Sequence, residues 1–253
     1  GRDDSLVDMP KVSVPALMDI EQIRYISASF KAQTSCFDGM HPKHLSGLTD
    51  QALTGLAKLF RGFEVLGQWP KSEQAVLTAL IPKTDGGLRP IALFRTTFRV
   101  YAKCRSFKVK KWAASLPDAQ CNNSAGRWVG DSTWRMQIRA ITSTLKKFIE
   151  FLLDVRKAFE HVQRGQLLSE AKINGYTSAE ALASITSYSW PRYITCEGLL
   201  AEPIIAKRGI AAGSAFATFA LWFLLRSAIM NLQIAHPLAS IFFRVVDLCL
   251  THT

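Results

Sequence analysis

The stretch FIEFLLDVRKAFEHV, from Phe148 to Val162, decides the fold. Its first part, Phe148 to Val155, is strongly apolar and predicts a strand, with an acid, Asp154, near its end. A helix-compatible segment follows at once. A carboxylate in this position lies at the edge of a sheet, where sheet proteins commonly bind ligands and metal ions. Asp is also a favoured N-cap residue, so capping of the following helix is an equally good local explanation.

A second apolar run with a single acid, FFRVVDLCL, lies near the end of the sequence and carries Asp247. We expect a strand over Phe242 to Val246. If the two strands lie side by side, Asp154 and Asp247 can share divalent ions, because hard carboxylate oxygens suit Mg²⁺. Two such ions about 3.5–4 Å apart are the usual means of joining or cutting phosphodiesters. An isolated carboxylate in apolar surroundings is costly, which favours a metal site.

The segment ALIPKTDGGLRPIAL predicts a hairpin, with a first strand over Ala75 to Ile81 and two glycines at the turn. Its tip presents Lys83 and Arg89. A paired Lys and Arg suits a triphosphate, because Arg binds phosphate oxygens in a bidentate manner. Many surface hairpins also carry two basic residues, so the motif alone is not specific.

The glycines of KRGIAAGSAFATF allow a nucleotide or another chain to approach the backbone at the start of a helix, and they also suit close helix packing. The 17 residues from Gly209 to Leu225 carry no charge, which is at the lower limit for a membrane span. We expect a turn at Gly209 to Ser214 and a buried helix from about Ala215 to Ile229. A spanning helix is the alternative.

Basic residues are concentrated in one part of the chain, which has 31 Lys and Arg against 20 Asp and Glu, a net charge of +11. Arg61 to Lys111 holds 11 basic and three acidic residues, a net +8. Aromatic residues are interleaved with these charges, namely Trp69, Phe94, Phe98, Tyr101 and Phe107. This mixture favours a surface that neutralises phosphates and packs bases; a solvated charged face is the alternative.

Helical spacing predicts further helices, and cysteine usage indicates the compartment. The helices are expected at Asp19 to Ser29, Thr49 to Leu66, Thr133 to Lys147 and Gln166 to Asn174. The five cysteines form no CxxC pair, and the first residues lack the apolar run of a signal peptide. We therefore expect an intracellular protein, in the nucleus or the cytoplasm.

Taken in order, these segments resemble the reverse transcriptase domain of non-LTR (LINE-type) retrotransposons and its relatives in group II introns. The matching segments follow the order and approximate spacing of that family: FDGMHPKHL, LIPK followed by GGLRPIAL, DVRKAFEHV, RGIAAGS and RVVDLCL. The resemblance runs from about residue 20 to the end of the sequence. It implies an α+β fold, the fingers and part of the palm of a right-hand polymerase, with an antiparallel palm sheet packed on helices and no thumb.

The resemblance also implies a set of site residues and ligands. Asp154 and Asp247 would be the catalytic carboxylates and, with the carbonyl of Val155, would hold two Mg²⁺ ions, or Mn²⁺. Phe159 would exclude a ribose 2′-hydroxyl. The triphosphate would be held by Lys83 and Arg89, and the nucleotide and template side would be lined by Gly213 and Ser214. The implied partners are an RNA template, a DNA primer and dNTP, with no membrane favoured.

The sequence departs from the family pattern at the second acidic motif. The family has an aromatic residue and two acids there, whereas Val245 to Leu248 contains Asp247 alone. Ala212 stands where the family commonly has Gln. We expect an N-terminal extension over 1–30, fingers over 31–147 and an incomplete palm over 148–253, within a longer polyprotein. The alternatives are a catalytically inactive retroelement remnant that binds RNA or DNA, and a membrane protein.

Overall fold

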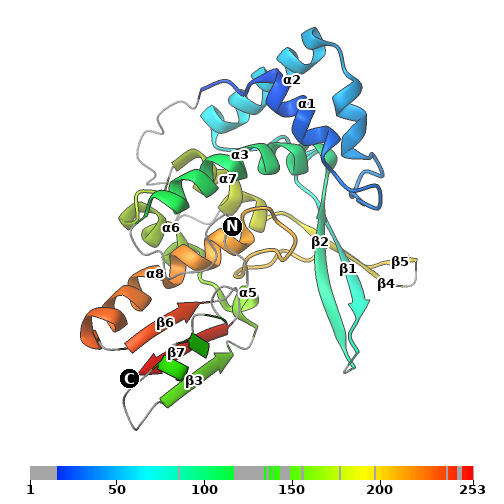
Figure 1. The fold of residues 1–253 in the computed structure, drawn as a ribbon. Coiled ribbons are helices and arrows are strands. Elements are labelled where there is room, and N and C mark those ends of the chain that lie inside the picture. Colours follow the sequence, from blue (N-terminus) through cyan, green and yellow to red (C-terminus); the bar gives the residue numbers. More distant parts are fainter. Residues whose placement is uncertain are drawn as a thin grey trace.

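The computed structural model describes residues 16–84, 86–116, 134, 137–138, 140–142, 149–154, 157–176, 178–196, 198–237, 239–243 and 247–252. They form a mixed α+β structure with two sheets (Figure 1). The helices are α1 (Ile20–Ala28), the 3-10 helix η2 (Pro42–Gly47), α2 (Asp50–Leu66), α3 (Thr96–Ser115), α5 (Ala158–His161), α6 (Arg164–Ile173), α7 (Ser178–Tyr188) and α8 (Ala217–Ala235). The strands are β1 (Val76–Pro82), β2 (Leu88–Phe94), β3 (Ile149–Asp154), β4 (Arg192–Cys196), β5 (Leu199–Leu200), β6 (Ala239–Phe243) and β7 (Asp247–His252).

The first two α-helices begin where the sequence predicts, because each has a side-chain cap. The Asp19 carboxylate accepts a hydrogen bond from Glu21 N at 3.2 Å, and the Thr49 hydroxyl accepts one from Ala52 N at 3.3 Å. Such caps satisfy backbone N–H groups that have no partner inside the helix. Helix α2 ends at Gly67, which adopts a left-handed conformation with φ 65°.

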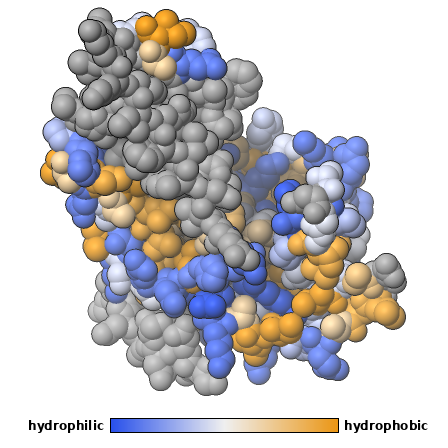
Figure 2. Space-filling model, turned by 90° about the horizontal axis from the view of Figure 1, so that it is seen from below, coloured by the Kyte–Doolittle hydropathy of each residue, from blue (hydrophilic) through white to orange (hydrophobic). Residues whose placement is uncertain are grey.

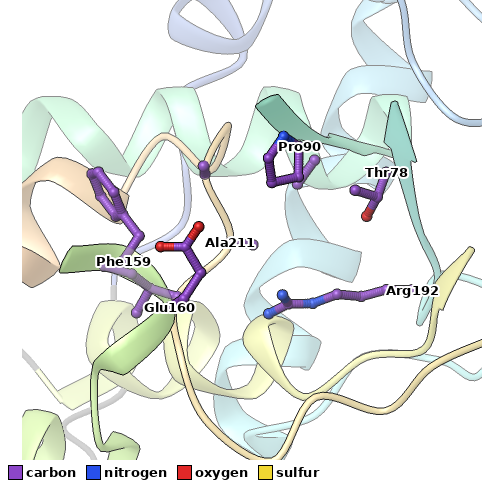
Figure 3. A pocket seen from close by; sticks show the side chains of 9 residues that line it. Thr78, Pro90, Phe159, Glu160, Arg192 and Ala211 are labelled. Carbon is purple, nitrogen blue, oxygen red and sulfur yellow. The ribbon is translucent and has the colours of Figure 1, made fainter. Parts of the chain in front are cut away.

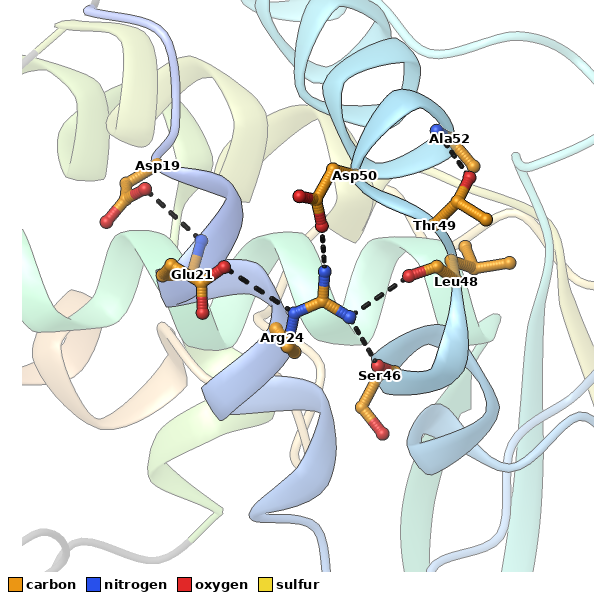
Figure 4. Close-up of polar contacts among 8 residues, drawn as sticks. All are labelled: Asp19, Glu21, Arg24, Ser46, Leu48, Thr49, Asp50 and Ala52. Carbon is orange, nitrogen blue, oxygen red and sulfur yellow. Dashed lines mark hydrogen bonds and ion pairs between the residues drawn. The ribbon is translucent and has the colours of Figure 1, made fainter.

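Arg24 connects α1 to the start of α2 (Figure 4). Its guanidinium donates to the carbonyl oxygens of Ser46 and Leu48, at 2.9 and 3.0 Å. It also forms ion pairs with Asp50 and Glu21, at 2.5 and 3.6 Å. The planar guanidinium can make these contacts together because its five N–H donors diverge.

The first sheet has the strand order β2-β1-β4-β5. The predicted hairpin is confirmed: β1 and β2 pair antiparallel, with Ile81 opposite Arg89. The next strand, β4, is parallel to β1, with Arg192 opposite Val76. This sheet and the segment that follows β5 carry exposed apolar side chains, namely Ile81, Leu88, Leu199, Leu200, Ile204 and Ile205. Figure 2 shows hydrophobic groups on the side of the molecule where this sheet lies.

The second sheet has the order β3-β7-β6, with both pairings antiparallel. The strand predicted from Phe148 is confirmed over 149–154. Of the strand expected over Phe242 to Val246, the structure describes 242 and 243, which lie in β6; the antiparallel neighbour β7 begins at Asp247. Residues 244–246 lie outside the described residues.

An aromatic cluster forms the centre of the core, and this corrects the role expected for most aromatic residues of the basic segment. Trp69, Phe94, Phe98 and Tyr101 are at most 4% exposed. Their rings contact one another, with the Trp69 and Tyr101 centroids 5.0 Å apart. They cannot stack on bases, because their rings are buried in the core. Phe107 differs, since it is 46% exposed.

Helix α8 extends further than expected, to Ala235. Among the described residues it is the helix long and apolar enough to cross a membrane, and 39% of its most apolar window is buried in the protein. A single such helix is weak evidence for a span, because the core helix of a soluble protein has the same properties. The helix predicted at Thr133 to Lys147 lies largely outside the described residues, although 134, 137–138 and 140–142 are helical.

Candidate active site

The two acids singled out in the sequence lie opposite each other in the second sheet. Asp154 is the last residue of β3, Asp247 is the first residue of β7, and they are register partners. Directly opposed residues of an antiparallel pair share one face, with Cβ atoms typically about 4.5–5.5 Å apart. The register therefore brings together two positions that are 93 residues apart in the sequence (247 minus 154). Val155 lies outside the described residues.

This pair of acids suits a magnesium site in its chemistry. Mg²⁺ is commonly bound by one or two carboxylates together with waters and substrate phosphates. Among the described residues, no group of three or more His, Cys, Asp or Glu residues could hold a metal ion. If a metal ion binds at this end of the second sheet, Asp154 and Asp247 are the acids that the register brings together to hold it.

Phe159 lies on the short helix α5, which follows closely after Asp154. The helix begins after Lys157, which has a positive φ of 52°. This conformation is uncommon outside Gly and is typical of sharp changes in chain direction. The Phe159 carbonyl oxygen accepts a hydrogen bond from Ile210 N at 2.9 Å, so α5 is attached to the glycine-containing loop.

The loop from Gly209 to Ser214 packs between α5 and the hairpin and is hydrogen-bonded to both. Gly213 has φ 111°, and a Cβ atom there would lie 2.4 Å from the carbonyl oxygen of Ala92. The Ala92 N–H donates to the carbonyl oxygen of Ala212 at 2.7 Å. The close approach requires glycine, because backbone atoms cannot move aside as a flexible side chain can. Ser214 is buried, and its hydroxyl accepts a hydrogen bond from Phe216 N at 3.3 Å.

The hairpin tip carries the two expected cations in exposed positions. Lys83 precedes the turn, and its backbone N–H donates to the Gly87 carbonyl oxygen at 3.1 Å. Arg89 follows on β2. Among the described residues neither side chain has an ion-pair partner.

Arg164 supports the loop from Gly209 to Ser214, a role that the sequence analysis did not predict. It is 7% exposed. Its Nε donates to the Gly209 carbonyl oxygen at 3.0 Å, and its guanidinium also donates to the carbonyl oxygens of Tyr188 and Arg208, at 2.6 and 3.3 Å. Burial raises the pKa of the Tyr188 phenol above its usual value. A buried Arg at a helix start carries no recognisable sequence signal, so only the fold reveals this role.

A pocket lies where the hairpin, α5, the loop and β4 meet (Figure 3). It has a volume of about 50 Å³. Its lining is Thr78, Pro90, Ala92, Phe159, Glu160, Arg192, Ile210, Ala211 and Ala212. Phe159 was expected at a nucleotide site, whereas no sequence pattern indicated a role for Glu160 or Arg192 in a site.

Helix α3 carries basic residues of this segment that remain partly accessible. Arg99, Lys103 and Lys110 follow one another at intervals of four and seven residues, and α3 contains no acidic residue. Lys103 lies 4.1 Å from the centroid of the Phe30 ring, and Lys110 lies 5.5 Å from that of Phe107. Burial, and then the charges of Lys110 and Arg99, lower the pKa of Lys103. The positive charges thus repel one another, which favours an anionic partner.

Comparison of the chain with models of known protein families finds no match, and neither does comparison with curated proteins. Among solved structures, it is similar to apo telomerase from Candida tropicalis truncated from the C-terminal domain, with a TM-score of 0.53 and 12% sequence identity. The similarity covers 87% of this chain and 52% of the telomerase chain, so this chain spans about half of that structure. The protein therefore has a reverse-transcriptase-like polymerase fold.

Proposed function

We propose that this chain is the RNA-directed DNA polymerase domain of a LINE-type retroelement. Its reaction would be attack of a primer 3′-hydroxyl on the α-phosphate of a dNTP. The observation that carries the proposal is the register pairing of Asp154 with Asp247 within a reverse-transcriptase-like fold. Chains of this kind read an RNA template, work inside the cell and belong to longer polyproteins. In that assignment 31–147 are fingers and 148–253 an incomplete palm.

Each site residue has one task in this reaction. Asp154 and Asp247, with the Val155 carbonyl, would hold Mg²⁺ or Mn²⁺. When bound, the metal ions supply a Lewis acid that activates the nucleophile and stabilises the leaving pyrophosphate. The triphosphate is bound by Lys83 and Arg89. The Phe159 ring excludes a ribose 2′-hydroxyl by steric contact.

The loop and α3 would serve the nucleic acid. Gly213 and Ser214 line the nucleotide and template side through their backbone atoms. The loop backbone can lie close to the hairpin because Gly213 has no Cβ. Arg99, Lys103 and Lys110 neutralise phosphates, and the rings beside the lysines orient the cations. Contacts to phosphates do not depend on base sequence, so the template is held without sequence preference on this helix.

Primer extension on an RNA template with dNTPs and Mg²⁺ tests the proposal. We expect Asp154→Asn and Asp247→Asn each to reduce incorporation at least about a hundredfold, because removal of a preorganised charged group typically costs that much. The matched control is Asp50→Asn, which removes an acid that is exposed on α2. Incorporation that survives in both active-site variants contradicts the assignment of the two acids.

The alternative function is a catalytically inactive remnant that binds RNA or DNA. It is favoured by one observation: Leu248 follows Asp247 and pairs with Leu153, so an apolar pair stands next to the acidic pair. This function predicts template binding without incorporation. Recovery of incorporation in the Leu248→Asp variant would then identify the lost acid as the cause.

A further inference from the structure

The pocket between the hairpin and α5 contains a cation that the proposed reaction does not use. Arg192 enters the pocket from β4, and Glu160 lines it from α5. Figure 3 shows the Glu160 carboxylate turned away from the Arg192 guanidinium. Among the described residues, Arg192 forms no ion pair within 4 Å. Its positive charge therefore faces the pocket without a carboxylate beside it.

The Arg192 guanidinium is held in place and still has donors for a ligand. The Arg192 N–H donates to the Ile204 carbonyl oxygen and the Ile204 N–H donates back, both at 2.9 Å. The guanidinium donates to the Tyr188 carbonyl oxygen at 3.2 Å. A guanidinium has five N–H donors, so this contact leaves several of them. Burial lowers the pKa of Arg192, although the charge of Glu160 opposes the shift, and an anion beside the guanidinium would offset the cost of that burial.

A hydroxyl group lies on the same face of the first sheet as Arg192. Val76 is the register partner of Arg192, and Thr78 follows two residues further along β1. Side chains two residues apart in a strand share a face, so Thr78 and Arg192 are diagonal neighbours on the side that lines the pocket. A threonine hydroxyl can donate one hydrogen bond to a ligand held by the guanidinium.

The loop contributes a buried backbone donor. Ala211 lines the pocket and is 2% exposed. On one side Ile210 N donates to the Phe159 carbonyl oxygen at 2.9 Å, and on the other the Ala212 carbonyl oxygen accepts from Ala92 N at 2.7 Å. The Ala211 N–H, in contrast, donates to no acceptor in the part of the chain that the structure describes. Buried N–H groups without an acceptor are rare, so this one indicates a place for a ligand atom.

The pocket has the size of one tetrahedral anion. Its volume is about 50 Å³. A water molecule occupies about 10–15 Å³ of such a volume, so the pocket holds roughly three to five oxygen-sized groups. A phosphate group has four oxygens and fits this space, whereas a whole nucleobase does not.

We infer that Arg192, the Thr78 hydroxyl and the Ala211 N–H form a binding site for one phosphate group. Arg binds phosphate oxygens in a bidentate manner, and a hydroxyl and a backbone N–H are common donors to the remaining oxygens. The phosphate belongs either to the triphosphate of a nucleotide or to the backbone of a nucleic acid. Only this choice of source rests on the proposed function; the site itself follows from the pocket. All four nucleotides carry the same phosphates, so the site does not select a base.

Protection of arginine from phenylglyoxal, followed by peptide mass spectrometry, tests the site in the whole wild-type chain. Phenylglyoxal modifies accessible guanidinium groups, and the probe is inorganic pyrophosphate in metal-free buffer. We expect saturating pyrophosphate to slow the modification of Arg192 at least about tenfold, because charge-assisted hydrogen bonds occupy the guanidinium. Arg61, which is exposed on α2, is the internal control and should react at an unchanged rate.

Three results overturn the inference. The first is an Arg192 that does not react in the free chain, because the pocket would then be closed to ligands. The second is an Arg192 that pyrophosphate does not protect. The third is protection confined to Arg89, which would place the anion at the hairpin tip.

The Glu160→Gln variant provides a test of opposite sign. Glu160 is exposed, so the substitution leaves the core intact and removes a negative charge near the bound anion. We expect the pyrophosphate concentration that half-protects Arg192 to fall about two- to threefold. Glu21→Gln, which removes an exposed acid on α1, is the matched control and should leave that concentration unchanged. An unchanged or higher concentration in Glu160→Gln contradicts the site.

The same measurement distinguishes the two sources of the phosphate. Stronger protection by dTTP than by single-stranded RNA, compared per phosphate, assigns the site to the nucleotide, and the reverse assigns it to the nucleic-acid backbone. Protection by neither overturns both assignments. Primer extension with Asp154→Asn is independent: its failure sinks the polymerase proposal, while protection of Arg192 by pyrophosphate would still stand.

Discussion

Gly213 is the residue whose identity the structure explains most directly. A Cβ atom at this position would meet the Ala92 carbonyl oxygen at 2.4 Å, and φ is 111°. We expect Gly213→Ala to lower the free energy of unfolding by about 3 kcal/mol, because overpacking and a strained backbone each cost about 1–3 kcal/mol. Urea denaturation followed by circular dichroism measures this change.

Gly55 is the matched control for Gly213. It lies inside α2, and nothing lies within 4 Å of a Cβ built there. Gly55→Ala should raise the free energy of unfolding by about 0.5–1 kcal/mol, because Ala loses less backbone entropy than Gly in a helix. Equal effects of the two substitutions would show that the loop does not contact the hairpin as closely as described.

Cysteine reactivity gives a second prediction at the residue scale. Burial raises the pKa of the Cys104 thiol to about 12, whereas Cys196 is exposed. The thiolate is the reactive form, so at pH 8 Cys104 is almost fully protonated as well as inaccessible. We expect iodoacetamide at pH 8 to modify Cys196 in the native chain and to leave Cys104 unmodified, as read by peptide mass spectrometry. Equal labelling of both in folded protein would contradict the burial of Cys104.

At the scale of elements, α2 and α3 are joined by a buried ion pair. Glu64 accepts hydrogen bonds from Arg105, one of them at 2.7 Å, and from the Tyr101 hydroxyl at 3.1 Å. The Glu64 side chain is 1% exposed. We expect Glu64→Gln to lower the free energy of unfolding by about 3 kcal/mol, because it leaves the Arg105 charge buried without its partner. Guanidinium-chloride denaturation provides the measurement.

The exposed pair between Arg24 and Asp50 is the comparison. The Asp50 side chain is 74% exposed. Exposed pairs contribute about 0–1 kcal/mol, so Asp50→Asn should change the free energy of unfolding by less than about 1 kcal/mol. A larger loss of unfolding free energy for Asp50→Asn than for Glu64→Gln would contradict the expectation that the buried ion pair matters more.

The elements predicted correctly from the sequence are those whose ends are set by nearby residues, such as a helix cap or a turn glycine. The capped helices α1 and α2 and the glycine turn of the hairpin are of this kind. Helix α3 was missed because its apolar and basic residues follow no simple amphipathic pattern: it is buried on several sides by other elements. The division of the last apolar stretch into β6 and β7 was missed because the sequence there carries no turn signal, and β7 is defined by its long-range pairing with β3 as well as by its pairing with β6.

The same distinction applies to the candidate site. Asp154 and Asp247 were found because each is an acid near one end of an apolar, strand-like run, and the register shows that they lie opposite each other. Their roles, and those of Lys83, Arg89 and Phe159, stay predictions. Arg164 and Arg192 could not be found, because each acquires its position from contacts with segments about 45 and 12 residues away, at Gly209 and Ile204.

At the scale of the whole molecule, the charge distribution indicates where a polyanion binds. Arg99 and Lys103 line a pocket between α3 and the loop that also includes Gly213 and Ala215. Their described hydrogen-bond acceptors are neutral, such as the Ser29 hydroxyl, which lies 2.8 Å from Lys103 Nζ. The positive charge is thus held in position without being neutralised by a carboxylate. A phosphate backbone bound here would release the cations condensed on the nucleic acid.

Salt dependence of RNA binding tests this surface. Each phosphate contact contributes about −0.7 to the slope of log K against log[salt] for a single strand. The double variant Arg99→Gln with Lys103→Gln should therefore reduce the magnitude of the slope by about 1.4, measured by fluorescence anisotropy with a labelled single-stranded RNA. The control is Lys58→Gln with Arg61→Gln, which removes the same charge from exposed positions on α2. If both double variants lower the slope equally, net charge rather than the position of α3 governs binding; if only the α3 variant does, the strand passes along α3 beside the loop that contains Gly213.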